Sequence, residues 1–215
     1  YLDDELIDAS ATQVEVGGTQ GIEFTIEVDK DCSLRAELSS IDDLSLDDAG
    51  CSRNGIRFSR IGGAYLSDCA TVEDWGCGLG GFRRFCRTEY VGVDGTNTPH
   101  SDVHADLTTY RSSSEGIFMR HVLEHNHEWR KVLEAACQSF TKKLFLVLYT
   151  PFVRETRPVG RTRFVTLSFR KKDITDVLDK YGCSYAIEVL EPSDMSEWKG
   201  IPEYENEHLF RVARF

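Results

Sequence analysis

The stretch Val72–Phe82, with the sequence VEDWGCGLGGF, decides the fold of this 215-residue chain. An apolar lead-in and an acid precede four glycines, Gly76, Gly78, Gly80 and Gly81. Glycines at such places let the chain turn sharply out of a strand and bring bare backbone N–H groups close to a ligand, because no Cβ stands in the way. The stretch therefore predicts a loop that binds a nucleotide cofactor.

Two spacings fit these glycines. Gly76, Gly78 and Gly81 match the G-x-G-x-x-G spacing of dinucleotide-binding loops, which would hold NAD. Asp74, with glycines at 76, 78 and 80, matches the D-x-G-x-G-x-G spacing of S-adenosylmethionine-dependent methyltransferases. The glycines alone leave both cofactors open, and the residues downstream have to decide.

Three downstream segments favour methyl transfer. Tyr90–Asp94 reads as a short buried strand whose final acid stands 14 residues after Gly80, with room for the loop and one short helix. Val103–Asp106 reads as a third strand ending in an acid, and Glu115–His125 as a fourth strand followed by VLEH. In this order and spacing the chain resembles the class I (Rossmann-like) methyltransferases from about residue 70 to 152, and VLEH is frequent in their small-molecule-type members.

The resemblance implies which residues contact S-adenosylmethionine. The loop from Asp74 to Gly80 would hold its amino-acid end, and Asp94 its ribose hydroxyls. The backbone of Ala105 and the carboxylate of Asp106 would contact the adenine edge. Together the implied cofactor contacts are Asp74, Gly76, Cys77, Gly78, Gly80, Asp94, Gly95, Ala105, Asp106 and Arg120.

Two of these acids also have simpler interpretations. Asp94 precedes Gly95 and could start a turn, since Asp-Gly is a common turn dipeptide. Asp106 could cap a helix that begins near Leu107. Either role is compatible with cofactor contact.

Arg120 and His121 are the candidate catalytic residues, because they follow the fourth strand and would line the mouth between cofactor and acceptor. A histidine there with a pKa near neutrality could act as general base, and a structural or packing role stays open. His121 and His125 also have the i, i+4 spacing that binds metals on a helix. No convincing third ligand follows, so no metal is predicted.

Composition predicts one catalytic domain in the cytoplasm. With 40% apolar and 11% aromatic residues the chain can bury a full core. No apolar run approaches 18 residues and no signal-type N-terminus appears, so we expect a soluble protein with no membrane segment. Seven scattered cysteines without a C-x-x-C pair are typical of reduced, intracellular thiols.

Residues 1–50 are distinct, since they carry 14 acids against Lys30 and Arg35 in a chain of net charge −11. Alternation in Gln13–Val16 and Gly21–Val28 predicts a hairpin, and Ile56–Arg60 a further short strand. The predicted domains are residues 1–60, an acidic accessory or substrate-selecting segment, and residues 61–215, the methyltransferase domain. A solvated acidic flap fits the first equally well.

The remaining chain continues the α/β alternation. Trp129–Ser139 and Ser168–Tyr181 have helical periodicity, and Lys143–Tyr149 is a buried fifth strand. Tyr185–Leu190 and Glu207–Phe215 suit a terminal antiparallel hairpin, which separates this methyltransferase sheet from a dinucleotide-binding one. The predicted fold is α/β, a Rossmann-like, mostly parallel sheet of seven strands with a terminal antiparallel strand.

Basic residues gather from 153 to 172, where Glu155 is the one acid. After the carboxyl end of a strand, guanidinium groups could clamp a phosphate or carboxylate of the acceptor, which makes Arg154, Arg157 and Arg161 the candidate substrate-binding residues. They could instead pair with the acidic N-terminal segment.

The predicted function is methyl transfer to a hydroxyl or amine of a small molecule or sugar-like metabolite. The chain lacks the [DN]-P-P-[YF] tetrapeptide of amino-directed nucleic-acid methyltransferases, and its net charge of −11 opposes tight nucleic-acid binding. An RNA or cap methyltransferase that uses the 154–172 loop is the first alternative. A non-catalytic partner subunit with the same fold is the second.

Overall fold

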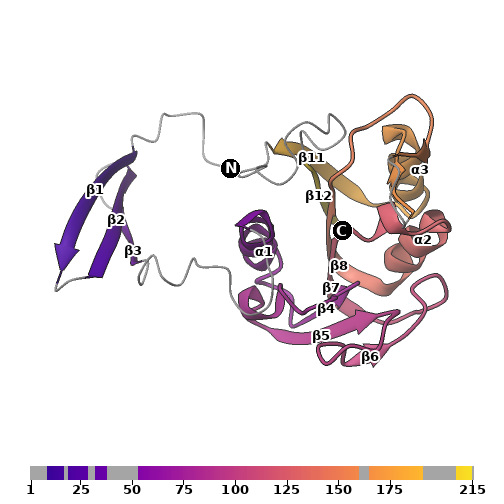
Figure 1. Cartoon of the computed structure of the whole chain (residues 1–215), viewed down its shortest axis with the longest axis horizontal. Coiled ribbons are helices and arrows are strands. Elements are labelled where there is room, and N and C mark those ends of the chain that lie inside the picture. Colours follow the sequence, from indigo (N-terminus) through magenta and orange to yellow (C-terminus); the bar gives the residue numbers. More distant parts are fainter. Residues whose placement is uncertain are drawn as a thin grey trace. The chain divides into compact units, whose positions relative to one another are not determined.

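The computed structural model of the chain describes residues 9–16, 19–28, 32–37, 53–159, 165–190 and 207–214. The chain divides into two compact units, residues 1–48 and 49–215. The domain boundary expected at residues 60 and 61 is placed too late, because it falls inside helix α1 (Arg53–Tyr65) of the second unit (Figure 1).

The first unit contains a three-stranded antiparallel sheet. Strand β1 (Ala9–Val16) pairs along its whole length with β2 (Thr19–Val28), so the predicted hairpin is confirmed. Strand β3 (Cys32–Glu37), which the sequence pattern did not reveal, pairs with the other edge of β2.

The second unit is built on a seven-stranded sheet in the order β11-β12-β8-β7-β4-β5-β6 (Figure 1). All neighbours are parallel except β12, which runs antiparallel to both β8 and β11. The predicted fold, with its terminal antiparallel strand, is confirmed. The strands are β4 (Thr71–Trp75), β5 (Glu89–Asp94), β6 (Val103–His104), β7 (Ser114–Arg120), β8 (Phe140–Leu148), β11 (Ser184–Leu190) and β12 (Glu207–Ala213).

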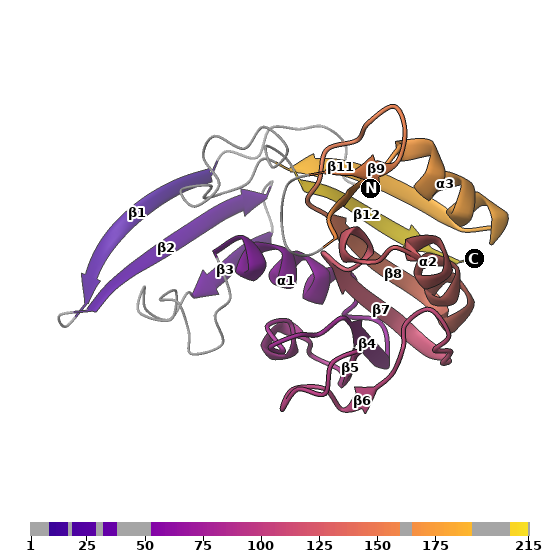
Figure 2. The ribbon, with the colours of Figure 1, turned by 45° about the vertical axis from the view of Figure 1, so that its right-hand side comes forward.

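Helices cover both faces of this sheet. Helix α1 lies on one face, and α2 (Trp129–Ser139) and α3 (Lys171–Lys180) lie on the other (Figures 1 and 2). The central strands contribute side chains to the cores on both faces of the sheet, because successive side chains of a strand point to opposite faces. In β7, Ile117 and Met119 join the core under α2 and α3, whereas Phe118 joins the core under α1.

The strand predicted at Ile56–Arg60 is wrong, because these residues lie within α1. Ile56 and Phe58 are both buried and mimic a strand in a short window. Over the longer window the buried positions recur at Ile56, Ser59, Gly62 and Leu66, which is helical spacing.

The crossovers around β5 and β6 contain less helix than expected. Between β4 and β5 the predicted short helix is a single 3₁₀ turn, η2 (Arg83–Phe85). No helix begins near Leu107, where the chain forms only a turn before β7. Helix α3 begins at Lys171 rather than at Ser168, which belongs to β10.

A small hairpin follows β8 and carries part of the basic segment. Strand β9 (Arg157–Pro158) pairs antiparallel with β10 (Leu167–Ser168). Arg161 and Arg163 lie outside the described residues. No helix in the described part of the chain is long and apolar enough to span a membrane.

Three stacked rings hold the α1 face together. The ring of Phe118 lies 3.9 Å from that of Phe82 and 5.4 Å from that of Phe145, nearly parallel to both. A Cβ at Gly62 of α1 would come within 2.5 Å of Phe118, so the helix backbone packs directly on this ring. The stack joins α1, the glycine loop and two central strands.

Replacing the central ring tests this packing. We expect Phe118→Ala to lower the free energy of unfolding by about 3–5 kcal/mol, because it leaves a cavity between two rings. Leu79→Ala, at a position that is 58% exposed, is the matched control and should change it by less than about 0.5 kcal/mol. Urea unfolding with an unchanged slope measures both, and equal effects of the two substitutions would contradict the assignment.

Candidate functional site

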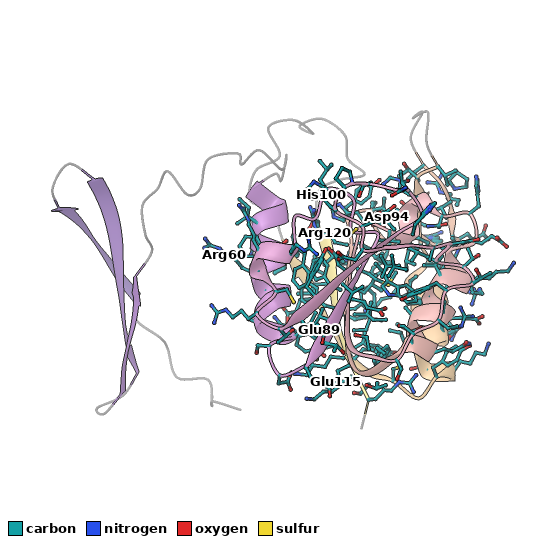
Figure 3. The ribbon with its side chains drawn as sticks, turned by 90° about the horizontal axis from the view of Figure 1, so that it is seen from below. Arg60, Glu89, Asp94, His100, Glu115 and Arg120 are labelled. Atoms are coloured by element: carbon teal, nitrogen blue, oxygen red, sulfur yellow. The ribbon has the colours of Figure 1, made fainter. Side chains whose placement is uncertain are left out.

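A cavity of about 540 Å³ lies at the carboxyl ends of the parallel strands β4, β5, β6 and β7. Figure 3 shows Asp94 and Arg120 at this end of the sheet, with Glu89 and Glu115 at the opposite end. Open α/β sheets place ligands at this edge. The cavity is lined by Gly76, Asp94, Gly95, Thr96, His104, Asp106, Leu107, His121, Val122, His125 and Asn126.

The glycine loop needs its glycines for backbone reasons. Gly76, Gly78 and Gly80 have φ angles of 75°, 51° and 72°, a region that side chains with a Cβ rarely adopt. At Gly76 a Cβ would also lie 2.5 Å from a methyl group of Val122. The turn therefore requires glycine and sits directly against the segment that follows β7.

Cys77 points into the protein from this loop. Its thiol is buried and lies 3.7 Å from the carbonyl oxygen of His100. Burial raises the pKa of Cys77 to about 12, so the side chain stays a neutral thiol at physiological pH. Its role is packing beneath the loop.

Asp94 ties the second strand to the glycine loop. Its Oδ2 accepts a hydrogen bond from the Gly78 amide at 2.9 Å, and its Oδ1 accepts one from the Thr96 amide at 2.7 Å. The second bond is the turn interaction that the Asp-Gly dipeptide predicts. Each carboxylate oxygen can accept a further bond, since a carboxylate has about four acceptor positions.

Asp106 caps a turn, not a helix. Its Oδ1 accepts hydrogen bonds from the amide and the hydroxyl of Thr108, both at 2.8 Å, and these bonds lower the pKa of the carboxyl. The carboxylate is exposed at the rim of the cavity. Nearby, the ring of His104, in β6, lies 2.8 Å from the carbonyl oxygen of Gly95 and links β6 to the loop after β5.

Asp74 lies beneath the glycine loop, inside the protein, and does not line the cavity. It is buried, and the Tyr90 hydroxyl donates a hydrogen bond to its Oδ2 at 2.9 Å. Burial raises the pKa of Asp74 to about 7. Of the predicted cofactor contacts, those that do not line the cavity are Asp74, Cys77, Gly78, Gly80, Ala105 and Arg120.

His121 lies at the cavity wall as predicted, but its predicted near-neutral pKa is wrong. Burial, aided by the neighbouring Arg120 cation, lowers the pKa of His121 to about 4. The imidazole is therefore neutral at pH 7. Its ring packs on Tyr149, with 4.6 Å between the ring centres.

His121 and His125 do not share a helix face, as a metal site with their i, i+4 spacing would require, because only the 3₁₀ turn η3 (Leu123–His125) follows β7. His125 Nδ1 lies 2.9 Å from the carbonyl oxygen of Val165, and His125 Nε2 lies 3.4 Å from the Tyr149 hydroxyl. Val165 lies just before β10, so these contacts bring that segment of the chain beside the cavity-lining His125.

Two buried acids belong to this region, and neither is among the predicted site residues. Glu207 Oε1, on β12, lies 3.1 Å from His121 Nε2 and 3.7 Å from Arg120. Glu124 accepts a hydrogen bond from the Tyr149 amide at 2.7 Å, and burial raises its pKa to about 8. Glu124 is the acid of VLEH and could have been found from that motif, whereas Glu207 becomes a neighbour only through the strand order.

The basic segment is divided between paired and unpaired groups. Arg170 and Lys172 form ion pairs with Asp173 and Asp176 along α3. Arg154 and Arg157 are exposed and form no ion pair among the residues that the structure describes. Only these two of the three candidate substrate-binding arginines can be placed, since Arg161 lies outside that part of the chain.

The raised pKa of Glu124 predicts how stability depends on pH. Its folded value of about 8 lies above its ordinary 4.5, so the folded state holds a proton that the unfolded chain has released between these pH values. This contribution is fully present below pH 4.5 and is lost as the pH rises through 8. The raised pKa of Asp74 likewise makes the free energy of unfolding fall with rising pH, up to about pH 7. The lowered pKa of His121 makes it rise with pH between about pH 4 and pH 6.5.

We therefore expect the free energy of unfolding to depend less steeply on pH in Glu124→Gln than in the wild type. Between pH 6.5 and 8 the wild-type free energy of unfolding should fall relative to that of the variant by up to about 1.4 kcal/mol per pH unit. Urea unfolding at several pH values measures the difference. Glu128→Gln, at an exposed site paired with Lys131, is the control, and parallel curves for all three proteins would contradict the buried proton.

No protein-family model and no curated protein sequence matches the chain. Solved structures do match. The 1,6-didemethyltoxoflavin-N1-methyltransferase of Burkholderia thailandensis, with 1,6-didemethyltoxoflavin and S-adenosylhomocysteine bound, is 14% identical with a TM-score of 0.59, over 95% of this chain and 98% of that one. Magnesium protoporphyrin IX methyltransferase from Synechocystis PCC 6803, with S-adenosylhomocysteine bound, is 14% identical with a TM-score of 0.53, over 75% and 84%. The chain therefore has the fold of the class I S-adenosylmethionine-dependent methyltransferases.

Proposed function

We propose that this protein is an S-adenosylmethionine-dependent methyltransferase that acts on a hydroxyl or amine of a small molecule. The observation that carries the proposal is the left-handed glycine loop, bound to Asp94 at the edge of a cavity of about 540 Å³. Two enzymes of the same fold bind S-adenosylhomocysteine.

The residues around the cavity suit this cofactor. The volume is within the range of about 300–1,000 Å³ that small-molecule sites occupy. Gly76 lines the cavity with a backbone that a side chain could not adopt without clashing with Val122, so the loop presents bare backbone to a ligand there. Asp94 would accept hydrogen bonds from the ribose hydroxyls, and the loop around Leu107 would contact the adenine.

The chain itself would have to align the acceptor, exclude water and accept one proton. When bound, the cofactor would supply a methyl group activated for attack by the acceptor's lone pair, with S-adenosylhomocysteine as the leaving group. The cavity walls would align the acceptor and exclude water. His121, neutral at pH 7, would take the acceptor's proton; a base with a pKa of about 4 assists best when that proton is itself acidic, as on a phenol or enol.

The basic hairpin supports an acceptor with an anionic group. Arg154 and Arg157 are exposed, and Arg157 belongs to β9, whose partner strand β10 begins two residues after Val165, the residue that contacts His125. Two other members of the cluster, Arg170 and Lys172, are already paired with acids on α3. Two exposed guanidinium groups suit a carboxylate or phosphate on a small acceptor, and the net charge of −11 opposes tight binding of an RNA strand.

Calorimetric titration with S-adenosylmethionine, S-adenosylhomocysteine and NAD tests the cofactor. We expect both adenosyl ligands to bind, and Asp94→Ala to weaken them by roughly 10- to 150-fold, because a charge-assisted contact of about 1.5–3 kcal/mol is lost. Asp176→Asn, on the exposed side of α3, is the control and should leave affinity unchanged. Binding of NAD alone would refute the proposal.

A metabolite screen for S-adenosylhomocysteine release would identify the acceptor, and His121→Ala then tests the base. We expect turnover to fall by about 10²–10⁴-fold, the usual contribution of general-base assistance, while the affinity for S-adenosylhomocysteine stays nearly the same. His127→Ala, at an exposed position, is the matched control. Full turnover without the His121 imidazole would remove it from the mechanism.

A further inference from the structure

His121 is held by a carboxylate that lies 86 residues away in the sequence. Glu207 is the first residue of β12, and only 8% of its side chain is exposed. Its Oε1 lies 3.1 Å from His121 Nε2. The guanidinium of Arg120 approaches the same oxygen at 3.7 Å.

This contact selects one tautomer of the imidazole. An ionised carboxylate has only acceptor positions, so the Nε2 of His121 carries the hydrogen and donates it. The lone pair of the neutral ring is then on Nδ1. Nδ1 makes no hydrogen bond to the described residues, and His121 lines the cavity with 24% of its side chain exposed.

The backbone of His121 gives independent support. Its φ of 58° is the one positive φ of a non-glycine residue in the described part of the chain. Such a conformation costs free energy and persists where the surroundings impose it, often at functional sites. Here the His121 amide donates to the carbonyl oxygen of Val147 at 3.0 Å, which fixes the turn that carries the ring to the cavity wall.

We propose that Glu207 is a positioning residue, which holds His121 as the Nε2–H tautomer so that Nδ1 faces the methyl acceptor. This inference rests on the proposed function. As the acceptor attacks, its O–H or N–H bond breaks, the electron pair stays on the acceptor atom, and the proton passes to Nδ1. Glu207 then faces an imidazolium, which its carboxylate stabilises before the proton returns to solvent.

Several charged or titratable groups face this ring. Arg120 from β7 and His125 from η3 oppose its protonation, whereas Glu207 from β12 favours it. Tyr149 packs on the ring, and the buried Glu124 holds the Tyr149 amide. Loss of the Glu207 carboxylate would remove the group that favours protonation while Arg120 and His125 still oppose it, so His121 should become harder to protonate.

Nitrogen NMR of the full chain, labelled with ¹⁵N-histidine, tests this directly, with the His121 signals assigned from His121→Gln. In the wild type we expect protonated Nε2 and unprotonated Nδ1. In Glu207→Gln the amide can either accept from Nε2–H or donate to Nε2, so both tautomers should appear and the protonation midpoint should fall by about one pH unit. Glu207→Asp should restore one tautomer.

Glu188→Gln is the matched control, because Glu188 pairs with Arg211 on the same hairpin and away from His121. It should leave the His121 signals unchanged. A wild-type Nδ1–H tautomer, or an unaltered tautomer in Glu207→Gln, would overturn the proposal. If Glu207→Gln does not fold, the proposal is tested by the tautomer of His121 in the wild type and in Glu207→Asp, which should be Nε2–H in both.

Calorimetry with S-adenosylhomocysteine separates this inference from the proposed function. We expect Glu207→Gln to bind that ligand as tightly as the wild type, because Glu207 lies behind His121 and does not line the cavity. Failure of the wild type to bind it would refute the methyltransferase proposal, whereas the tautomer result would still report on the Glu207–His121 pair.

Discussion

The turn out of β4 is the constraint on which the rest of the site depends. The Gly76 amide donates to the carbonyl oxygen of Val93 at 2.7 Å, so the chain bends across the end of β5 as soon as β4 stops. The bend requires a positive φ at Gly76. It also requires glycine there, because a Cβ on this residue would clash with the side chain of Val122. One tight turn thus fixes the mutual positions of the segments after β4, β5 and β7. The cavity is the space that this arrangement leaves.

Much of the fold could be predicted because its signals are local. The glycine spacing, the acid that ends β5 and the terminal hairpin each need only a few residues, and the structure contains all three. Helix α1 was mistaken for a strand because Ile56 and Phe58 are both buried, which a five-residue window cannot distinguish from alternation. The short crossovers were missed because a parallel connection usually contains a helix, whereas here one 3₁₀ turn suffices between β4 and β5.

The chemistry of the site was less predictable than its location. That His121 stands at the cavity wall follows from its place after β7, but its pKa depends on burial and on Arg120, which no spacing reveals. Asp74 matches the cofactor motif, yet it does not line the cavity and accepts a hydrogen bond from the Tyr90 hydroxyl. Glu207 could not be found from sequence because its contact depends on β12 lying next to β8. Register between distant strands is the information that a single sequence lacks.

The position of β12 has a consequence for how the molecule is assembled. β12 lies between β8 and β11, although it follows both in the chain. During synthesis these two strands are made first, so until β12 enters between them β8 has one unpaired edge and β11 has no partner strand in the sheet. Exposed edges of this kind invite pairing with other chains. Sheet closure and the arrival of the Glu207 carboxylate beside His121 are the same event, so an incompletely folded chain cannot possess a finished proton-accepting group.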